Sequence, residues 1–114
     1  MENCLIEFRD DALYLTFHGE ITIEITAGLK KEIDKALQPS SFSSVVVNLS
    51  EVAFIDSSGI GFLVALNTRL ISLSRKMFLF KPSAQVKKTL DLVQLSSFFT
   101  IAADEDELLA LLPE

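Results

Sequence analysis

A β-branched run in the middle of the chain leads to a short polar loop. Val45, Val46 and Val47, followed by Leu49, form the nearly continuous apolar run typical of a strand buried on both faces. The run leads to Asp56-Ser57-Ser58-Gly59, after which apolar residues recur with helical spacing at 60, 63, 66, 70 and 73. Aspartate and serine are favoured at helix N-termini, because their side-chain oxygens accept unpaired backbone N–H groups. The pattern therefore predicts a buried strand, a polar turn and a helix over residues 58–73.

Two short strands and a helix are predicted ahead of this segment. Residues 4–9 and 13–18 form strands, joined as a hairpin at Asp10-Asp11, and Gly19-Glu20 is expected to end the second strand. The second strand alternates cleanly, which indicates that one face of the sheet is less covered than the other. Apolar residues every four positions predict a helix over 26–37, capped by Thr22 or Thr26 and ended by a loop with Pro39 and serines.

The rest of the chain continues to alternate strands with helices. A buried strand is expected at 77–80, then a helix capped by Ser83 with Val86, Leu90 and Val93 on its apolar face. An edge strand at 98–102 follows, and Asp104 with Glu107 forms a capping-box pattern before a leucine-rich last helix. We expect one α/β domain over residues 1–114, with a mixed, mostly parallel sheet of four to five strands packed with about four helices.

Composition narrows the functional classes. The chain has 114 residues, 49% of them hydrophobic, and a net charge of −6, which argues against a nucleic-acid partner because phosphate binding needs a basic surface. A single cysteine, Cys4, cannot form an internal disulfide and is expected in the core. A single histidine, His18, without clustered ligands predicts no metal site, and no cofactor motif is present. We therefore expect neither a metal ion nor a cofactor.

Targeting and assembly follow from the same patterns. No apolar run approaches the roughly 20 residues of a membrane span, and the N-terminus lacks the basic and apolar regions of a signal peptide. We expect a cytoplasmic protein that does not contact membranes. Because no long apolar stripe is left once the helices pack, we also expect a monomer when the protein is free.

The polar loop at 56–59 permits several interpretations from its residues alone. It can be a helix cap, with Gly59 allowing a close strand-to-helix approach, or an anion cradle, although it lacks P-loop spacing. A nucleophilic Ser57 activated by His18 is disfavoured, since no G-x-S-x-G elbow and no orienting carboxylate are evident. A phosphorylation switch is also compatible, because phosphate adds about −1.5 to −2 charges beside Asp56 and Glu20.

Several segments together resemble one family. They are L-Y-L-T-F-H-G-E-I at 13–21, V-V-V-N-L-S-E-V-A-F-I-D-S-S-G-I-G at 45–61, M-F-L-F-K-P-S-A-Q-V-K-K-T-L-D-L at 77–92 and the tail at 98–112. On these segments the chain resembles the STAS domain family, and within it the anti-sigma factor antagonists. The D-S-S-G segment, set between a strand and a helix, is the most specific of the matches.

The resemblance implies a binding module without enzymatic activity. Its partner would be an anti-sigma factor serine kinase with a histidine-kinase-like ATPase fold, bound by the unphosphorylated module and released after phosphorylation. A serine phosphatase would reset the switch. By position in the family motif the phosphoacceptor would be Ser57, with Ser58 as the fallback. The implied docking face comprises Glu20, Ile21, Thr22, Asp56, Ser57, Ser58, Gly59, Ile60, Gly61 and Phe62.

One departure from the family pattern keeps an alternative open. Many kinase-regulated members have Gly-Glu-Leu/Ile-Asp after the second strand, whereas this chain has Gly19-Glu20-Ile21-Thr22. The alternative is a STAS subunit of a constitutive signalling or lipid-transport complex, in which Ser57 is only a cap. A nucleotide site at the same helix start is a third hypothesis.

Overall fold

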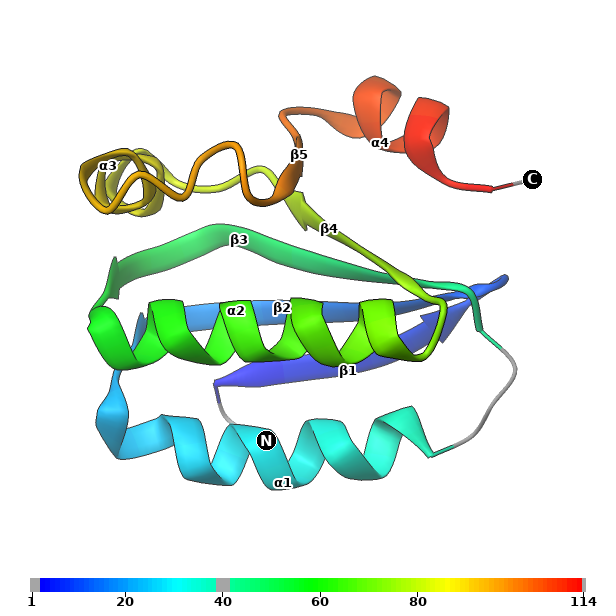
Figure 1. Cartoon of the computed structure of the whole chain (residues 1–114), viewed down its shortest axis with the longest axis horizontal. Helices are drawn as coiled ribbons and strands as arrows, with labels where there is room; N and C mark the ends of the chain where they lie inside the picture. Colours follow the sequence, from blue (N-terminus) through cyan, green and yellow to red (C-terminus); the bar gives the residue numbers. More distant parts are fainter. Residues whose placement is uncertain (1–2, 39–41, 114) are drawn as a thin grey trace.

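The computed structural model describes residues 3–38 and 42–113. Its elements follow the predicted alternation of strands and helices (Figure 1). They are β1 (Cys4–Arg9), β2 (Ala12–Ile21), α1 (Ile23–Leu37), β3 (Ser44–Ile55), α2 (Ser57–Ser72), β4 (Lys76–Phe80), α3 (Ala84–Leu92), β5 (Thr100–Ala102) and α4 (Glu105–Leu111).

The five strands form one sheet in the order β1-β2-β3-β4-β5. Strand β1 pairs antiparallel with β2, and all other neighbours pair parallel. The predicted hairpin, the mostly parallel sheet and the edge position of the last strand are confirmed. Helices α1 and α2 lie side by side and both begin at the sheet end where β2 and β3 finish (Figure 1).

Strand β3 is the centre of the core, as its β-branched run predicts. Val45 and Val47 join the larger core cluster, which also holds buried residues of α1, α2 and α3. Val46 points to the opposite face of the sheet, where it packs with Phe78 and with Leu108 of α4. Because α4 is short, this second face is covered less, which confirms the asymmetry expected from the alternation in β2.

Several predicted boundaries were wrong. Strand β2 does not end at Gly19-Glu20 but continues to Ile21. Gly19 has a positive φ of 78°, yet the pairing of β2 with β3 continues past it through two register shifts. Helix α1 begins at Ile23 rather than at 26, and β5 covers only 100–102 of the expected 98–102. The loop expected at Pro39 falls on residues 39–41, outside the described part of the chain.

The caps of α3 and α4 are those predicted, whereas Thr22, one of the two threonines expected to cap α1, makes no side-chain cap bond. Ser83 accepts a hydrogen bond from the backbone N–H of Val86, and Asp104 accepts one from Glu107. The Glu107 carboxylate in turn accepts a hydrogen bond from the N–H of Ala103, which completes the box one residue earlier than the ideal pattern. The apolar faces were overestimated at the helix ends. Val93, expected on the apolar face of its helix, is exposed, and so are Leu109 and Leu111 of the leucine-rich last helix, which was expected to pack through its leucines.

Cys4 lies in the core, as expected, and burial raises the pKa of its thiol to about 12 from an ordinary 9.0. At pH 8 we expect a soluble disulfide reagent to modify folded protein at least about tenfold more slowly than urea-unfolded protein. As the pH rises, the thiol of the unfolded chain loses its proton before the buried thiol of the folded chain does. The stability that Cys4 contributes through its raised pKa is therefore complete below pH 9 and declines as the pH rises toward 12. Equal modification rates in the two states would contradict the buried position.

Within residues 3–38 and 42–113, no helix is both long and apolar enough to cross a membrane.

Candidate functional site

Asp56 connects the starts of two helices. Its Oδ1 accepts a hydrogen bond from the N–H of Gly59 in the first turn of α2 (2.9 Å), which confirms the predicted cap. Its Oδ2 accepts a second hydrogen bond from the N–H of Ile23, the first residue of α1 (3.3 Å). Thr22, the N-cap residue of α1, makes no side-chain cap bond. One carboxylate therefore caps both helices and holds their N-termini together.

Gly59 allows the first turn of α2 to lie directly against β2. A Cβ at this position would stand 2.4 Å from the carbonyl oxygen of Ile21 and 2.6 Å from Cγ1 of Ile55. The backbone N–H of Asp56 donates a hydrogen bond to the same Ile21 carbonyl (3.2 Å), which closes the junction. The predicted close strand-to-helix approach is confirmed. It positions the loop of residues 56–59 against the end of β2.

The two serines after Asp56 have different surroundings. Ser57, the first residue of α2, is exposed, whereas Ser58 is half-buried and lines a cavity between α1 and α2. Within the described residues, neither hydroxyl has a hydrogen-bond partner in the protein. The idea that Ser57 serves as the cap is wrong, because Asp56 occupies the N-cap position and provides both cap bonds.

The end of β2 lies beside this loop, as the sequence suggested. The parallel register places Glu20 opposite Phe54 and Ile21 opposite Ile55, one residue before Asp56. The Glu20 side chain is exposed, Thr22 is half-buried and Gly61 is exposed. The two segments named by the family resemblance are thus neighbours at the C-terminal ends of β2 and β3.

Burial separates these residues into supporting and accessible groups. Ile21 is 1% exposed and Ile60 is 6% exposed, and both belong to the core cluster. Their side chains, and the buried Gly59, are therefore out of reach of a docked protein. Phe62 is half-buried, with its ring at 76° to that of Phe17 and 6.3 Å between centroids.

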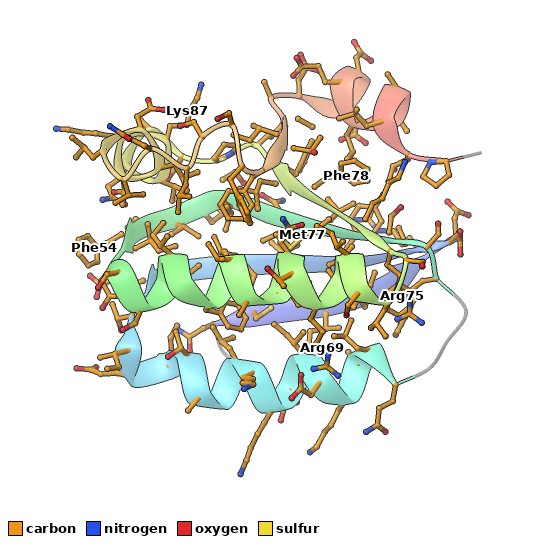
Figure 2. All side chains as sticks on the ribbon, in the orientation of Figure 1. Phe54, Arg69, Arg75, Met77, Phe78 and Lys87 are labelled. Atoms are coloured by element: carbon orange, nitrogen blue, oxygen red, sulfur yellow. The ribbon has the colours of Figure 1, made fainter. Side chains whose placement is uncertain are left out.

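Two exposed apolar side chains at this edge were missed. Ile23 is 69% exposed and Phe54 is 42% exposed. Figure 2 shows Phe54 at the end of the molecule where α2 begins. Ile23 stands outside the four-residue spacing of Ile25, Leu29, Ile33 and Leu37, so its exposure could have been predicted. Phe54 could not, because the register shifts in the β2–β3 pair alter which residues of late β3 face the core.

His18 does not belong to this site. It is exposed and lies three residues before Ile21, which pairs with Ile55, so at about 3.3 Å per strand residue its backbone is roughly 10 Å from the strand end that leads into Asp56. The weak hypothesis of a His18–Ser57 nucleophile therefore has no geometric support. Among the described residues, no three His, Cys, Asp or Glu side chains gather closely enough to hold a metal ion.

These features define a small α/β domain whose exposed serine and exposed apolar residues gather at one edge of the sheet. The family model of the STAS domain matches residues 3–108. The chain therefore belongs to the STAS domain family.

Solved structures share the fold at low sequence identity. A candidate anti-sigma factor antagonist from Thermotoga maritima is 23% identical over 94% of this chain and 92% of that chain, with a TM-score of 0.84. An anti-sigma factor antagonist from Mycobacterium paratuberculosis is 23% identical over 95% and 92%, with a TM-score of 0.82. The Bacillus cell fate determinant SpoIIAA, in its phosphorylated form, is 19% identical over 94% and 96%, with a TM-score of 0.71.

Proposed function

We propose that the protein is an anti-sigma factor antagonist whose binding is switched off by phosphorylation of Ser57. The observation that carries the proposal is an exposed serine at the start of α2 that has no structural task. Asp56 already caps both helices, so the Ser57 hydroxyl is free for a kinase. Family membership and the similarity to structures described as anti-sigma factor antagonists support the same function.

The docking face is built from the accessible residues around this serine. It comprises Glu20, Thr22, Ile23, Phe54, Ser57, Ser58, Gly61 and Phe62. Exposed apolar groups such as Ile23 and Phe54 give a partner surface to bury, while Glu20 provides charge at the rim. Asp56, Ile21, Gly59 and Ile60 support this face from below.

A phosphate on Ser57 would weaken docking on this face. It would place about −1.5 to −2 charges beside the carboxylates of Asp56 and Glu20 and next to apolar groups that a partner must desolvate. The helix start of α2 stabilises the phosphate within the module itself, so the modified state remains folded. Phosphorylation is thus an off switch for binding and has little effect on the fold.

The partners that fit this proposal are an anti-sigma factor serine kinase with a histidine-kinase-like ATPase fold and a serine phosphatase that resets the module. No enzymatic step is assigned to the protein itself. Thr22 stands where many kinase-regulated family members carry aspartate, and it leaves α1 capped by Asp56 alone. The kinase of this protein should therefore meet one carboxylate fewer at the docking face.

Substitution of Ser57 tests the switch. With the kinase immobilised, we expect Ser57→Ala to remain bound in the presence of ATP, whereas the wild type dissociates as it becomes phosphorylated. Ser57→Glu should bind at least about tenfold more weakly, equivalent to about 1.4 kcal/mol. Because Ser57 is not a cap, Ser57→Ala should change the unfolding free energy by less than about 0.5 kcal/mol.

Ser58→Ala is the matched control, since it removes the neighbouring hydroxyl. It should dissociate with ATP as the wild type does. Retention of Ser58→Ala together with release of Ser57→Ala would move the acceptor to Ser58. If all variants bound alike with and without ATP, the module would be a constitutive subunit instead of a switch.

A further inference from the structure

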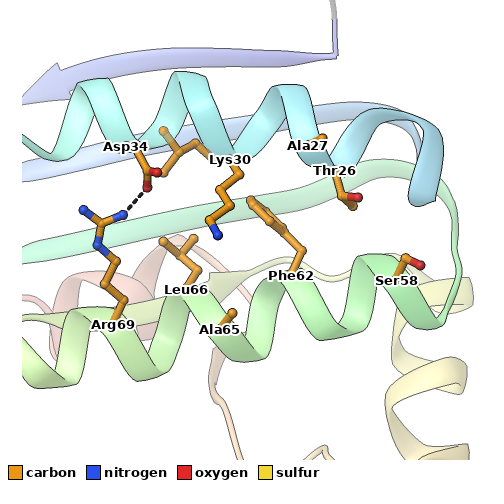
Figure 3. Close-up of a pocket in the computed structure, with 10 residues that line it drawn as sticks. Thr26, Ala27, Lys30, Asp34, Ser58, Phe62, Ala65, Leu66 and Arg69 are labelled. Atoms are coloured by element: carbon orange, nitrogen blue, oxygen red, sulfur yellow. Dashed lines mark hydrogen bonds and ion pairs between the residues drawn. The ribbon is translucent and has the colours of Figure 1, made fainter.

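A cavity lies between α1 and α2 and is lined by residues 26–34 of α1 and 58–69 of α2 (Figure 3). Its volume is about 320 Å³, within the range of roughly 300–1,000 Å³ that ligand pockets occupy. Ala27 and Ala65 line it from opposite helices, and their small side chains leave the seam between the helices open. This volume suits a small molecule.

The floor of the cavity is apolar. It is formed by Ile33 and Leu66, which are buried in the core, and by the half-buried ring of Phe62. The contact of Phe62 with the buried ring of Phe17 holds that floor in place. An occupant therefore needs an apolar body to displace water from this surface.

The charges of the cavity are unevenly used. At one end the guanidinium of Arg69 forms an ion pair with the carboxylate of Asp34, which closes the groove (Figure 3). The side chain of Lys30 extends across the seam toward α2. Within the part of the chain that the structure describes, no carboxylate lies within ion-pair distance of the Lys30 ammonium. The cavity thus offers one cation for an incoming anion, on a protein whose net charge is −6.

We propose that this cavity binds a small amphiphilic carboxylate, such as a medium-chain fatty acid. The tail lies over Phe62 and Leu66, and the carboxylate pairs with Lys30 at the mouth of the groove. A single ammonium matches a monoanion. A phosphate group would favour the bidentate fork of an arginine, and Nη1 of Arg69 is already paired with Asp34.

Ligand binding at this place would reach the first turn of α2. Ser58 lines the cavity at the end opposite the Arg69–Asp34 pair, and it is the neighbour of Ser57 (Figure 3). An occupant of the cavity therefore contacts the first turn of α2, which also contains Ser57. The binding proposal itself does not depend on the proposed switch, because the cavity and its charges exist whether or not Ser57 is phosphorylated.

Calorimetric titration of the whole protein with octanoate tests the proposal. We expect saturable one-site binding to the wild type and at least tenfold weaker binding to Lys30→Glu. Lys31→Glu is the matched control, since it makes the same charge change on an exposed lysine that does not line the cavity. Its affinity should stay within twofold of the wild type. Ala65 is exposed and lines the cavity, so Ala65→Phe should fill the cavity and abolish binding. Circular dichroism checks that this variant is folded.

The other outcomes overturn the proposal. They are the absence of saturable binding up to several millimolar octanoate, equal weakening by Lys30→Glu and Lys31→Glu, and unaltered binding by Ala65→Phe. If Ala65→Phe lost kinase binding while the wild type bound no octanoate, the groove would belong to the protein partner. None of these results uses ATP or Ser57, so they leave the phosphorylation switch to its own test.

Discussion

Gly59→Ala should lower the free energy of unfolding by about 2–3 kcal/mol, because the new methyl group has no space. Its Cβ would stand 2.4 Å from the Ile21 carbonyl oxygen, which belongs to the rigid backbone of β2 and cannot rotate away. The first turn of α2 must therefore shift off the sheet. Urea or thermal unfolding measures the effect, with a melting temperature lowered by about 10 °C.

Gly61→Ala is the control for this substitution, two residues further along the same helix. A Cβ at Gly61 meets no atom within 4 Å. Alanine there should raise the unfolding free energy by about 0.5–1 kcal/mol, because it restricts the unfolded chain and favours the helix. If the two alanines had effects of the same sign, the close approach at Gly59 would not determine stability.

Asp56→Ala should lower the unfolding free energy by about 2 kcal/mol, because two helices lose their cap and each cap contributes about 1 kcal/mol. The substitution removes the oxygens that accept from Gly59 in α2 and from Ile23 in α1. Chemical denaturation of the variant measures the sum. Hydrogen exchange at the two N–H groups should accelerate together, since both lose their acceptor.

Two comparisons separate the contributions of the caps. Asp56→Ser keeps one side-chain oxygen, so it should retain the α2 cap and fall about halfway between the wild type and Asp56→Ala. Asp104→Ala removes a single cap, that of α4, and should lower the unfolding free energy by about 1 kcal/mol. Equal effects of Asp56→Ala and Asp104→Ala would contradict the double role of Asp56.

The elements of this fold could be predicted from local sequence chemistry. The β-branched run at 45–49, the four-residue spacing before Leu37 and the caps at Asp56, Ser83 and Asp104 each produce a structure through interactions within a few residues. The alternation of strands with helices then restricts the connections to right-handed crossovers and a mostly parallel sheet. The adjacency of Glu20 and the 56–59 loop follows from that topology.

The remaining features depend on contacts that sequence periodicity does not encode. Gly19 is a residue typical of a strand end, yet β2 continues beyond it because the pairing with β3 continues to Ile21. The bond from the Ile23 N–H to Asp56 joins residues that are far apart along the chain. The division of the docking residues into buried Ile21 and Ile60 and accessible Ser57 likewise required the packed structure. The open seam beside Ala27 and Ala65 required it too.

Phosphopeptide mapping of the protein isolated from its own cells tests directly whether Ser57 is phosphorylated. Intact mass gives the fraction of modified protein under growth, stress and starvation, and fragmentation of the peptide with Ser57 and Ser58 assigns the modified serine. We expect one phosphate, on Ser57, with an occupancy that changes between conditions. Absence of phosphate on this peptide under all conditions would contradict it.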